Sequence, residues 1–471
     1  MWYSWPAGLC SAGRGARGTR LRLRTFVGGA HPPTHKDLTK DLAIVEAALP
    51  PRVVVALAQS LGAPAVPCVK VGDEVLAGQK VAEADGFVSV PVHAPVSGRV
   101  TGIGRFPHHL GSERPAIVIE SDGRDRWTDP LRQPGDPSSM SPDDIRRTVR
   151  EAGLAGLGGA AFPTHVKLSP PESKPIDAAV LNGAECEPWL TADHRLMLEK
   201  PAEVLLGFSL VMRALGCGHG LVGVEANKMD AVQALRGAVP SGAHIEIVPL
   251  EVKYPQGAEK QLIDALTGRK VPSGGLPMDV GIVVQNVGTS FAVYEACHLG
   301  VPLVSRVLTI TGTPLARPAN YRARIGTLVS ALVEQSGGLK GQVSKVVSGG
   351  PMMGVAQATL DVPVVKGMSG VLFLAEGEIE RRPPSPCLRC GQCVDTCPMR
   401  LVPMQLEKLV AAGEIDEAVE TGLADCMECG SCGFVCPSRR PLVHSFKLGK
   451  YLVAERKRAA AAAASRGAEA R

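Results

Sequence analysis

Between residues 141 and 300, short apolar runs alternate with segments in which apolar residues recur every three or four positions. The apolar runs predict buried strands, at 178–182, 219–226, 244–252 and 280–287. The segments with helical spacing lie near 200–215, 227–238, 257–267 and 289–299. Strands that alternate with helices favour a mostly parallel sheet covered by helices, so we predict an α/β domain here.

Two further segments have helical spacing. "SPDDIRRTVREAG", residues 141–153, has a capping-box start. "MQLEKLVAAGEIDEAVETGL", residues 404–423, contains Gly413, and we expect this glycine to divide the segment into two short helices.

The composition is that of an ordinary soluble globular protein, with 45% hydrophobic and 21% charged residues, and 471 residues suffice for two to four domains. No run of 18 or more apolar residues predicts a membrane span. The net charge of +5 is uneven, because no acidic residue precedes Asp37. That stretch holds Arg14, Arg17, Arg20, Arg22, Arg24 and Lys36. It is consistent with an organelle-targeting segment, a contact for anionic lipid or an acidic partner, or a solvated tail.

The chain has thirteen cysteines, and in a large chain without a convincing signal peptide they favour a reducing, cytosol-facing compartment over disulfides. Eight of them form two motifs, "CLRCGQCVDTCP" from Cys387 to Pro398 and "CMECGSCGFVCP" from Cys426 to Pro437. The others are interpreted as small buried hydrophobic residues: Cys10, Cys68, Cys186, Cys217 and Cys297.

Each motif reads C-x2-C-x2-C-x3-C-P, the spacing of two-cluster bacterial ferredoxins, in which the fourth cysteine ligates the other cluster. The prediction is one 4Fe–4S cluster on Cys387, Cys390, Cys393 and Cys436, and another on Cys426, Cys429, Cys432 and Cys397. A pair of structural zinc sites is the alternative, but zinc usually takes its ligands as two separated CxxC pairs. We therefore expect a two-cluster electron wire.

A glycine-rich loop, "AGLAGLGGAAFPTHVKL" from Ala152 to Leu168, contains no acidic residue. Gly156, Gly158 and Ala161 match the pattern G-x-G-x-x-[GA], but a helical segment precedes them in place of a strand, which disfavours a Rossmann site. A nest of backbone N–H groups closed by Lys167 is a good phosphate cradle. An apolar packing loop is the alternative.

Polar side chains follow the first predicted strand, where an α/β sheet places its ligand contacts. These are Asn182, Glu185 and Glu187, in "NGAECEP". The alternative is an exposed turn with helix-capping acids.

Four segments, "GLGGAAFPTHVK", "NGAECEP", "YPQGAEKQL" and "VVQNVGT", resemble in order the FMN- and NADH-binding segments of the flavoprotein subunit of respiratory complex I. They are more similar still to the C subunit of the Rnf electron-transport complex, an ion-translocating NADH:ferredoxin oxidoreductase. "GGAHPPTHK", Gly28 to Lys36, resembles the opening motif of that subunit. The resemblance covers residues 25–450 in the same module order.

The resemblance implies specific cofactor contacts and no catalytic side chain beyond them. The backbone of Gly156, Gly158 and Gly159, with Lys167, would meet the FMN phosphate and ring; Asn182, Glu185 and Asn286 would hold the flavin; Phe162 would stack on the nicotinamide side, with Glu187 and Glu259 near the NADH. Ala161, Ala184 and Ala258 depart from the family pattern. They leave the FMN assignment in place and weaken the NADH contacts.

Residues 69–103 resemble a biotinyl/lipoyl-type barrel-sandwich hybrid with Gly72, Gly78 and Gly98 in its hairpins. Its central turn, "EADGF", has no lysine, so we expect a scaffold or docking piece. Residues 307–354 resemble a small β-grasp domain, and "RRPPSP" is a stiff linker.

We therefore expect a multidomain α/β chain: a basic arm at 1–24, a barrel-sandwich hybrid region at 25–125, an FMN/NADH-binding α/β domain at 141–300, an SLBB-type β-grasp domain at 303–360, an α-helical ferredoxin-type domain with two 4Fe–4S clusters at 375–455, and a disordered tail at 456–471.

NADH moves two electrons as hydride, a 4Fe–4S cluster accepts one, and FMN connects the two modes. The resemblance implies a peripheral subunit on the cytoplasmic side of a bacterial inner membrane that exchanges electrons between NADH and ferredoxin. Membrane-embedded partner subunits would couple the exchange to sodium or proton movement, and no nucleic acid takes part. One alternative is a soluble cobalamin reductase, but in that protein the hybrid domain comes late in the chain. A second is the flavin subunit of a soluble hydrogenase or formate dehydrogenase, which normally has one cluster motif. A third is a scaffold that transfers electrons without binding NADH.

Overall fold

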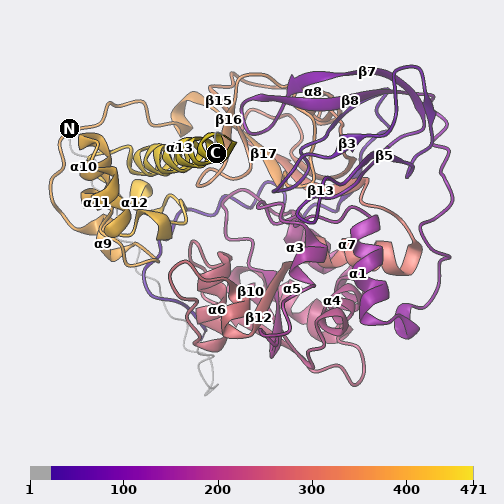
Figure 1. Cartoon of the computed structure of the whole chain (residues 1–471), viewed down its shortest axis with the longest axis horizontal. Helices are drawn as coiled ribbons and strands as arrows, with labels where there is room; N and C mark the ends of the chain where they lie inside the picture. The colour runs from indigo at the N-terminus through magenta and orange to yellow at the C-terminus, as the bar shows by residue number, and fades with distance from the viewer. Residues whose placement is uncertain (1–22, 470–471) are drawn as a thin grey trace.

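The computed structural model describes residues 23–469 (Figure 1). The strands of this part of the chain form four sheets. The helices α9 to α13, which carry the two cysteine motifs, lie to one side of the sheets (Figure 1). The predicted multidomain architecture is therefore present.

The first two sheets form the barrel-sandwich hybrid. One has the order β2-β8-β7-β4 and the other β3-β5-β6. Their strands are β2 (Arg52–Ala56), β3 (Val66–Pro67), β4 (Glu74–Val75), β5 (Lys80–Glu83), β6 (Val92–His93), β7 (Gly98–Pro107) and β8 (Glu113–Ser121). Gly72 and Gly78 have positive φ and lie in turns, as predicted, whereas Gly98 is the first residue of strand β7.

The third sheet is parallel throughout and has the order β11-β10-β9-β12. Its strands are β9 (Ala178–Gly183), β10 (His219–Glu225), β11 (Ile245–Leu250) and β12 (Ile282–Asn286). The helices of this domain are α1 (Pro142–Glu151), α2 (Thr164–Lys167), α3 (Ala192–Glu199), α4 (Pro201–Leu215), α5 (Met229–Ala238), α6 (Glu259–Thr267) and α7 (Val287–Tyr294). Each strand and helix predicted from periodicity between residues 141 and 300 is present.

Both faces of this sheet are covered. Ala179 and Leu181 of β9 pack with α1, α4, α5 and α7, whereas Val180 packs with α6 on the other face. Burial on both faces explains why these strands are continuous apolar runs. The carboxyl ends of the four strands meet at one edge, where loops from several elements converge.

The fourth sheet belongs to the β-grasp domain and has the order β1-β14-β13-β17-β15-β16. Its elements are β1 (Val45–Glu46), β13 (Ser305–Thr311), β14 (Ala319–Arg324), α8 (Val329–Gln335), β15 (Lys345–Ser348), β16 (Val355–Gln357) and β17 (Gly370–Leu374). The sheet continues beyond the predicted boundary at residue 360, because β17 lies inside it between β13 and β15. The pairing of β17 is long-range, so the local pattern did not reveal it.

The cysteine motifs lie among α9 (Gln392–Asp395), α10 (Pro403–Ala412), α11 (Ile415–Glu420), α12 (Ser431–Phe434) and α13 (Leu442–Glu469). Gly413 has a φ of +80° and ends α10, as predicted. Leu406, Val410, Ile415 and Phe446 form the small core between these helices.

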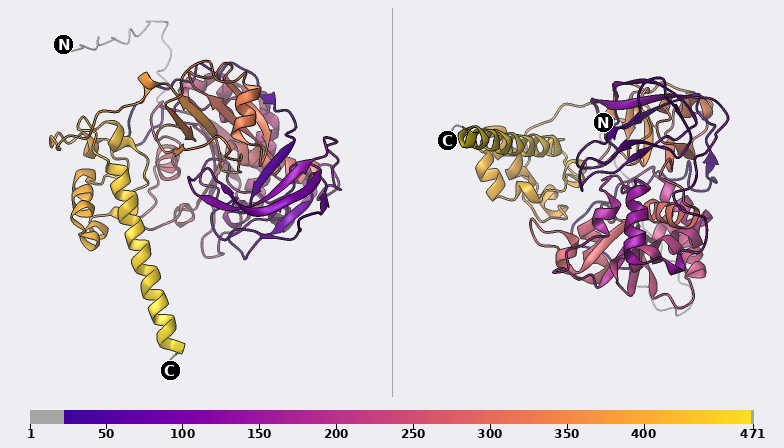
Figure 2. Two further views of the ribbon diagram at one scale, coloured as in Figure 1. Left: turned by 90° about the horizontal axis from the view of Figure 1, so that it is seen from above. Right: turned by 45° about the vertical axis from the view of Figure 1, so that its right-hand side comes forward.

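Helix α13 continues to Glu469 and projects away from the rest of the molecule (Figure 2). The prediction of a disordered tail from residue 456 is therefore wrong for residues 456–469. Alanine has the highest intrinsic helix propensity, so an alanine-rich segment that follows a helix readily extends it. Within residues 23–469, no helix combines the length and apolar character that a membrane crossing requires.

The basic arm is described only in part, since Arg14, Arg17, Arg20 and Arg22 lie outside the described residues. The Arg24 guanidinium donates to the carbonyl of Leu266 and lies 3.5 Å from the Glu246 carboxylate. Lys36 is buried. These two residues are therefore fastened to the protein and do not belong to a solvated tail.

The isolated cysteines differ in exposure. Cys217 and Cys297 are buried, as predicted. Cys68 is exposed, so that interpretation is wrong for this residue, which follows the short strand β3 at a sheet edge. Cys186 is half-buried and lines the cavity described below. Cys10 lies outside the described residues.

Candidate functional site

A cavity with an empty volume of about 550 Å³ lies at the carboxyl edge of the parallel sheet. Five of the predicted cofactor-binding residues line it: Gly158, Asn182, Glu185, Glu187 and Asn286. They come from the glycine loop, the end of β9 and the end of β12. The structure therefore brings together residues that are more than a hundred positions apart. We call this space the flavin cavity.

The glycine loop presents its backbone to this cavity. Gly156 N donates to Phe162 O (2.8 Å) and Leu157 N to the Thr289 hydroxyl (2.9 Å), which fixes the start of the loop. Among the described residues, no acceptor faces the amides of Gly158, Gly159 and Ala160. A Cβ on Gly158 would lie 3.1 Å from the Asn286 side chain. Free consecutive amides beside a crowded glycine fit a phosphate or flavin approaching the backbone.

Five predicted contacts do not line the cavity: Gly156, Gly159, Phe162, Lys167 and Glu259. Lys167 Nζ donates instead to the Glu259 carboxylate (2.7 Å) and to Val284 O (3.1 Å). The structure thus pairs a predicted flavin contact with a predicted NADH contact. The roles of both residues stay predictions.

The loop after β9 is held by its own polar groups. Glu185 has a φ of +42°, and its carboxylate accepts from Asp193 N (2.8 Å) and His194 N (3.1 Å), which caps helix α3. Asn182 Nδ2 donates to Gly257 O (2.8 Å). These bonds fix the cavity wall before any ligand arrives, and they agree with the helix-capping alternative for Glu185.

Glu187 points toward the β-grasp domain. Its carboxylate accepts from Met352 N (3.1 Å) and Met353 N (3.0 Å), and the Tyr254 hydroxyl lies 3.4 Å away. Burial raises the pKa of Glu187 to about 7. The Tyr254 hydroxyl also donates to Cys429 O (2.7 Å). Glu187 therefore lies between the flavin cavity and a predicted cluster ligand.

Two ionisable residues of the cavity, half-buried Asp193 and buried Arg306, were missed from the sequence. The Asp193 carboxylate accepts from Asn286 Nδ2 (2.6 Å), and burial together with the charge of Glu185 raises its pKa to about 7. Arg306 donates to Lys366 O (2.6 Å) and lines the same cavity, and burial lowers its pKa to about 10. An arginine inside the apolar strand "SRVLTIT" was the available signal.

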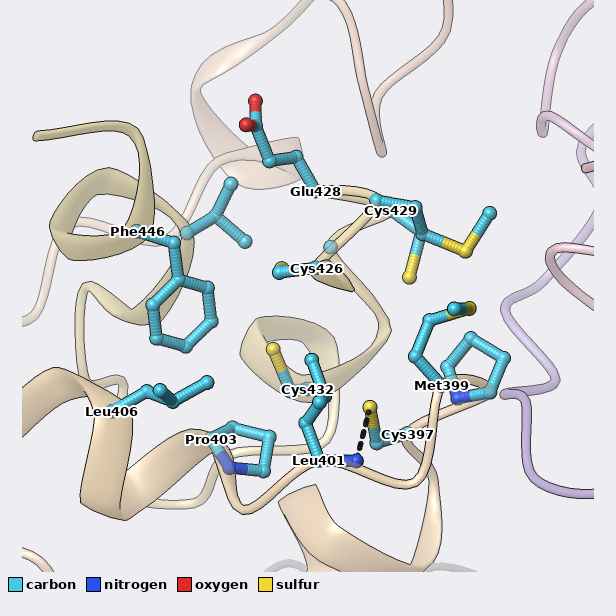
Figure 3. A pocket seen from close by; sticks show the side chains of 14 residues that line it. Cys397, Met399, Leu401, Pro403, Leu406, Cys426, Glu428, Cys429, Cys432 and Phe446 are labelled. Carbon is cyan, nitrogen blue, oxygen red and sulfur yellow. Dashed lines mark hydrogen bonds between the residues drawn. The ribbon is translucent and has the colours of Figure 1, made fainter. Parts of the chain in front are cut away.

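The cysteines surround two further cavities. Cys397 lies with Cys426, Cys429 and Cys432, between Phe446 and Leu406 on one side and Met399 on the other (Figure 3). We call this the proximal cavity. Cys436 lies with Cys387, Cys390 and Cys393 around the distal cavity. Each cavity thus takes three cysteines from one motif and the fourth from the other. The ligand sets themselves stay predictions.

The two motifs have the same backbone geometry. Gly391 and Gly430 have φ of +78° and +83°, and Arg389 and Glu428 have φ of +55° and +59°. The resulting turns bring three cysteine side chains of each motif to one cavity. Arg389 N lies 3.4 Å from the Cys387 sulfur, within reach of an N–H···S bond. In the described part of the chain, no three His, Cys, Asp or Glu side chains are close enough to hold a single metal ion. Four thiols around a space with apolar walls fit a 4Fe–4S cluster.

Together, the parallel α/β domain, its cavity and the two sets of thiols define a flavin and iron–sulfur electron-transfer protein. Family models agree segment by segment: "RnfC Barrel sandwich hybrid domain" at 24–124, "Nuo51 FMN-binding domain" at 149–295, "SLBB domain" at 307–356 and "4Fe-4S dicluster domain" at 386–439. These matches confirm the predicted fold class and the FMN and 4Fe–4S cofactors.

Relatives are similar over most of the chain. The C subunit of the Na(+)-translocating ferredoxin:NAD(+) oxidoreductase complex of Acetobacterium woodii is 46% identical over 92% of this chain and 98% of its own. The proton-translocating counterpart of Clostridium ljungdahlii is 46% identical over 84% and 87%. The C subunit of the ion-translocating oxidoreductase complex of Rhodobacter capsulatus is 42% identical over 93% and 84%. The chain belongs to the family of Rnf complex C subunits.

Solved structures are similar over a smaller part of the chain. A chain of an NAD+-reducing NiFe hydrogenase in the H2-reduced state matches with a TM-score of 0.49 and 21% identity. The match covers 66% of this chain and 63% of that chain.

Proposed function

We propose that this chain is the peripheral, NADH-linked subunit of an Rnf-type complex that exchanges electrons between NADH and ferredoxin. FMN bound in the flavin cavity converts between two-electron hydride transfer and single-electron transfer. The protein's part is to hold the flavin, exclude solvent and place the clusters. Partner subunits in the membrane couple the exchange to ion translocation.

For FMN, the amides of Gly158 to Ala160 and the side chains of Asn182 and Asn286 are the proposed contacts. Arg306 is a buried cation beside three acidic residues of the cavity. Its planar guanidinium carries several N–H donors, so it is a proposed hydrogen-bond donor to the ligand. Phe162 and Glu259, which do not line the cavity, remain the proposed contacts of the nicotinamide nucleotide.

A 4Fe–4S cluster held in the proximal cavity would be the electron acceptor for the flavin. The observation that carries this proposal is Tyr254, whose hydroxyl donates to Cys429 O (2.7 Å) and lies 3.4 Å from the Glu187 carboxylate of the flavin cavity. One side chain thus spans the two sites. A cluster in the distal cavity would then exchange electrons with the proximal cluster, within the ferredoxin-type domain.

We propose that electrons leave or enter this chain through the cluster of the distal cavity. Cys390 is exposed, and the neighbouring Leu388 is 70% exposed. An exposed cluster edge suits exchange with another electron-transfer protein. The proposed partner is a ferredoxin-like protein of the same complex, and through such partners the chain would lie at the cytoplasmic side of a bacterial inner membrane.

An NADH-to-ferricyanide assay on the chain loaded with FMN and both clusters tests the function. Ferricyanide accepts electrons at the flavin, so the assay does not depend on the partner subunits. We expect NADH oxidation in the wild type and in Cys397→Ser, which keeps the flavin cavity, and none in flavin-free Gly158→Val. A flavin-loaded wild type that does not oxidise NADH would contradict the proposal and favour the scaffold alternative.

A further inference from the structure

The segment Gly28–Lys36, "GGAHPPTHK", crosses from the ferredoxin-type domain to the flavin cavity. The proposed electron path gives it no role, since none of its residues lines any of the three cavities. Its backbone and side chains nevertheless bind residues beside two of them. We call this segment the strap.

One end of the strap is fixed beside the proximal cavity. Gly29 N donates to Thr396 O (2.8 Å), and the Thr396 hydroxyl donates to Gly29 O (2.5 Å). Gly28 has a φ of +83°, and a Cβ on it would lie 2.9 Å from the carbonyl oxygen of Cys397. Only glycine fits here without displacing the backbone of a predicted cluster ligand.

The middle of the strap binds Tyr254. Ala30 N donates to Tyr254 O (2.7 Å), and Tyr254 N donates to Ala30 O (2.8 Å). Tyr254 is the residue whose hydroxyl reaches Cys429 O. Further along, Trp189 N donates to Thr34 O (2.8 Å). The main chain of the strap therefore binds the main chain of Tyr254, whose side chain lies between the two sites.

The other end is fixed beneath the flavin cavity. The ammonium of Lys36 donates to the carbonyls of Glu185 (2.9 Å), Glu187 (2.9 Å) and Leu190. Lys36 is 5% exposed, and an ammonium has three donors, all of which are used here. These carbonyls belong to the loop that carries the Glu185 and Glu187 side chains into the cavity.

We propose that the strap sets the separation of the flavin and the proximal cluster, with Gly28 and Lys36 as the positioning residues at its two ends. It binds the loop of each site directly and the tyrosine between them. The kinetic consequence rests on the function proposed above. Electron transfer between two centres slows as the distance between them grows, so a loosened strap slows transfer between the sites.

The test compares Gly28→Ala with Gly86→Ala in the chain loaded with FMN and clusters. Gly86 has a nearly identical φ of +84°, but a Cβ there meets nothing within 4 Å. Both variants carry the same backbone strain, and only Gly28→Ala presses on Cys397. We expect Gly28→Ala to slow cluster reduction by NADH a few-fold relative to Gly86→Ala, with ferricyanide activity unchanged. Equal rates in both variants would overturn the proposal.

Lys36→Met tests the other end, with Lys40→Met, whose half-buried side chain pairs with Asp37 outside the strap, as its control. We expect Lys36→Met to release FMN more readily and to slow cluster reduction in the molecules that retain it. Thr396→Val, which removes one hydroxyl, serves if Gly28→Ala loses its clusters on purification. A Lys36→Met protein with flavin retention and cluster reduction equal to those of Lys40→Met would remove Lys36 from the strap's role.

Hydrogen exchange separates this inference from the proposed function, because it needs no electron transfer. The amide exchange of residues 393–400 and of Tyr254 should quicken in Gly28→Ala relative to Gly86→Ala. If the wild type does not oxidise NADH but exchange quickens, the function fails and the strap stands. If exchange is unchanged, the strap proposal fails whatever the activity.

Discussion

The proximal and distal cavities share a motif, a backbone geometry and a crossed set of four cysteines, but their surroundings differ. Around the proximal cavity, Cys429 and Cys432 are 7% and 8% exposed. Around the distal cavity, Cys390 is exposed. The same ligand pattern has thus been placed once against the flavin domain and once toward solvent. The difference between the two cavities therefore comes from the packing around each motif and not from the motifs themselves.

The contacts around the proximal cavity come from other parts of the chain. Tyr254 and Gln261 of the flavin domain reach Cys429 O and Pro398 O (3.3 Å). Gly430 lies so close to the β-grasp domain that a Cβ would be 2.7 Å from Met352 O. Around the distal cavity, the contacts come from within its own domain, such as the Ser438 hydroxyl to Pro386 O (2.9 Å).

The largest expected effect is the loss of FMN, which would supply electrons to the clusters of both cavities. Gly158→Val should abolish FMN retention, because a β-branched side chain blocks the ligand's approach to the backbone amides and collides with Asn286. Flavin absorbance and the reduction of the clusters by dithionite and by NADH are the measurements. Gly218→Val, at an exposed position with nothing within 4 Å, is the control. Flavin retained in Gly158→Val would remove the loop from the site.

The next effect separates the two cavities. Cys436→Ser should destroy the distal cluster and leave the proximal one, so that iron falls from about eight to about four per chain. The cysteine belongs to the second motif, but its side chain lies with the first three cysteines of the other. Iron analysis and low-temperature EPR measure this. Loss of the cluster held by Cys426, Cys429 and Cys432 would mean that the ligation is not crossed.

A smaller effect concerns the bridge. Tyr254→Phe removes the hydroxyl that donates to Cys429 O and leaves that buried carbonyl without its donor, at a cost of about 1–3 kcal/mol in stability. NADH-driven reduction of the proximal cluster should slow a few-fold, and the spectrum of the distal cluster should not change. Stopped-flow absorbance follows the rate. A rate equal to that of the wild type would show that the hydroxyl does not hold the two sites together.

The smallest effect is a pH dependence confined to the flavin side. The pKa of Glu187 is raised by burial from 4.5 to about 7, so between these values the folded chain holds a proton that the unfolded chain has lost. Stability therefore falls as pH rises through this window. Between pH 5 and 7, the free energy of unfolding should therefore fall by about 2 kcal/mol more in the wild type than in Glu187→Gln, which has no carboxyl group to titrate. The urea midpoint for flavin release measures this, with exposed Glu172→Gln as control. Parallel pH profiles of wild type and Glu187→Gln would contradict it.

Much of the fold could be predicted because its signals are local. The strands of the parallel sheet are continuous apolar runs, and Gly413 ends its helix where the sequence places a break. The cysteine spacing likewise predicts which thiols gather. Tight turns bring the first three cysteines of each motif together, and the ferredoxin pattern places the fourth with the other motif. The tail shows the limit: we expect disorder from residue 456, but helix α13 continues to Glu469, because alanine favours helix.

The site was predicted less completely because its walls come from distant segments. Arg306 reaches the flavin cavity from the β-grasp domain, and Lys36 reaches its loop from the start of the described chain. The Glu187 carboxylate binds two amides of "GGPMMG", which no pattern in "NGAECEP" indicates. Such contacts depend on how domains pack, and periodicity along one segment carries no information about that.

The order of electron flow is the central claim, and rapid mixing with NADH followed by freeze-quench EPR tests it most directly. The two proteins to compare are Cys436→Ser, which keeps only the proximal cluster, and Cys397→Ser, which keeps only the distal one. We predict that NADH reduces the proximal cluster of Cys436→Ser at the wild-type rate. In Cys397→Ser, the distal cluster should stay oxidised on the same timescale while dithionite still reduces it. Reduction of the distal cluster in Cys397→Ser at the wild-type rate would contradict the account.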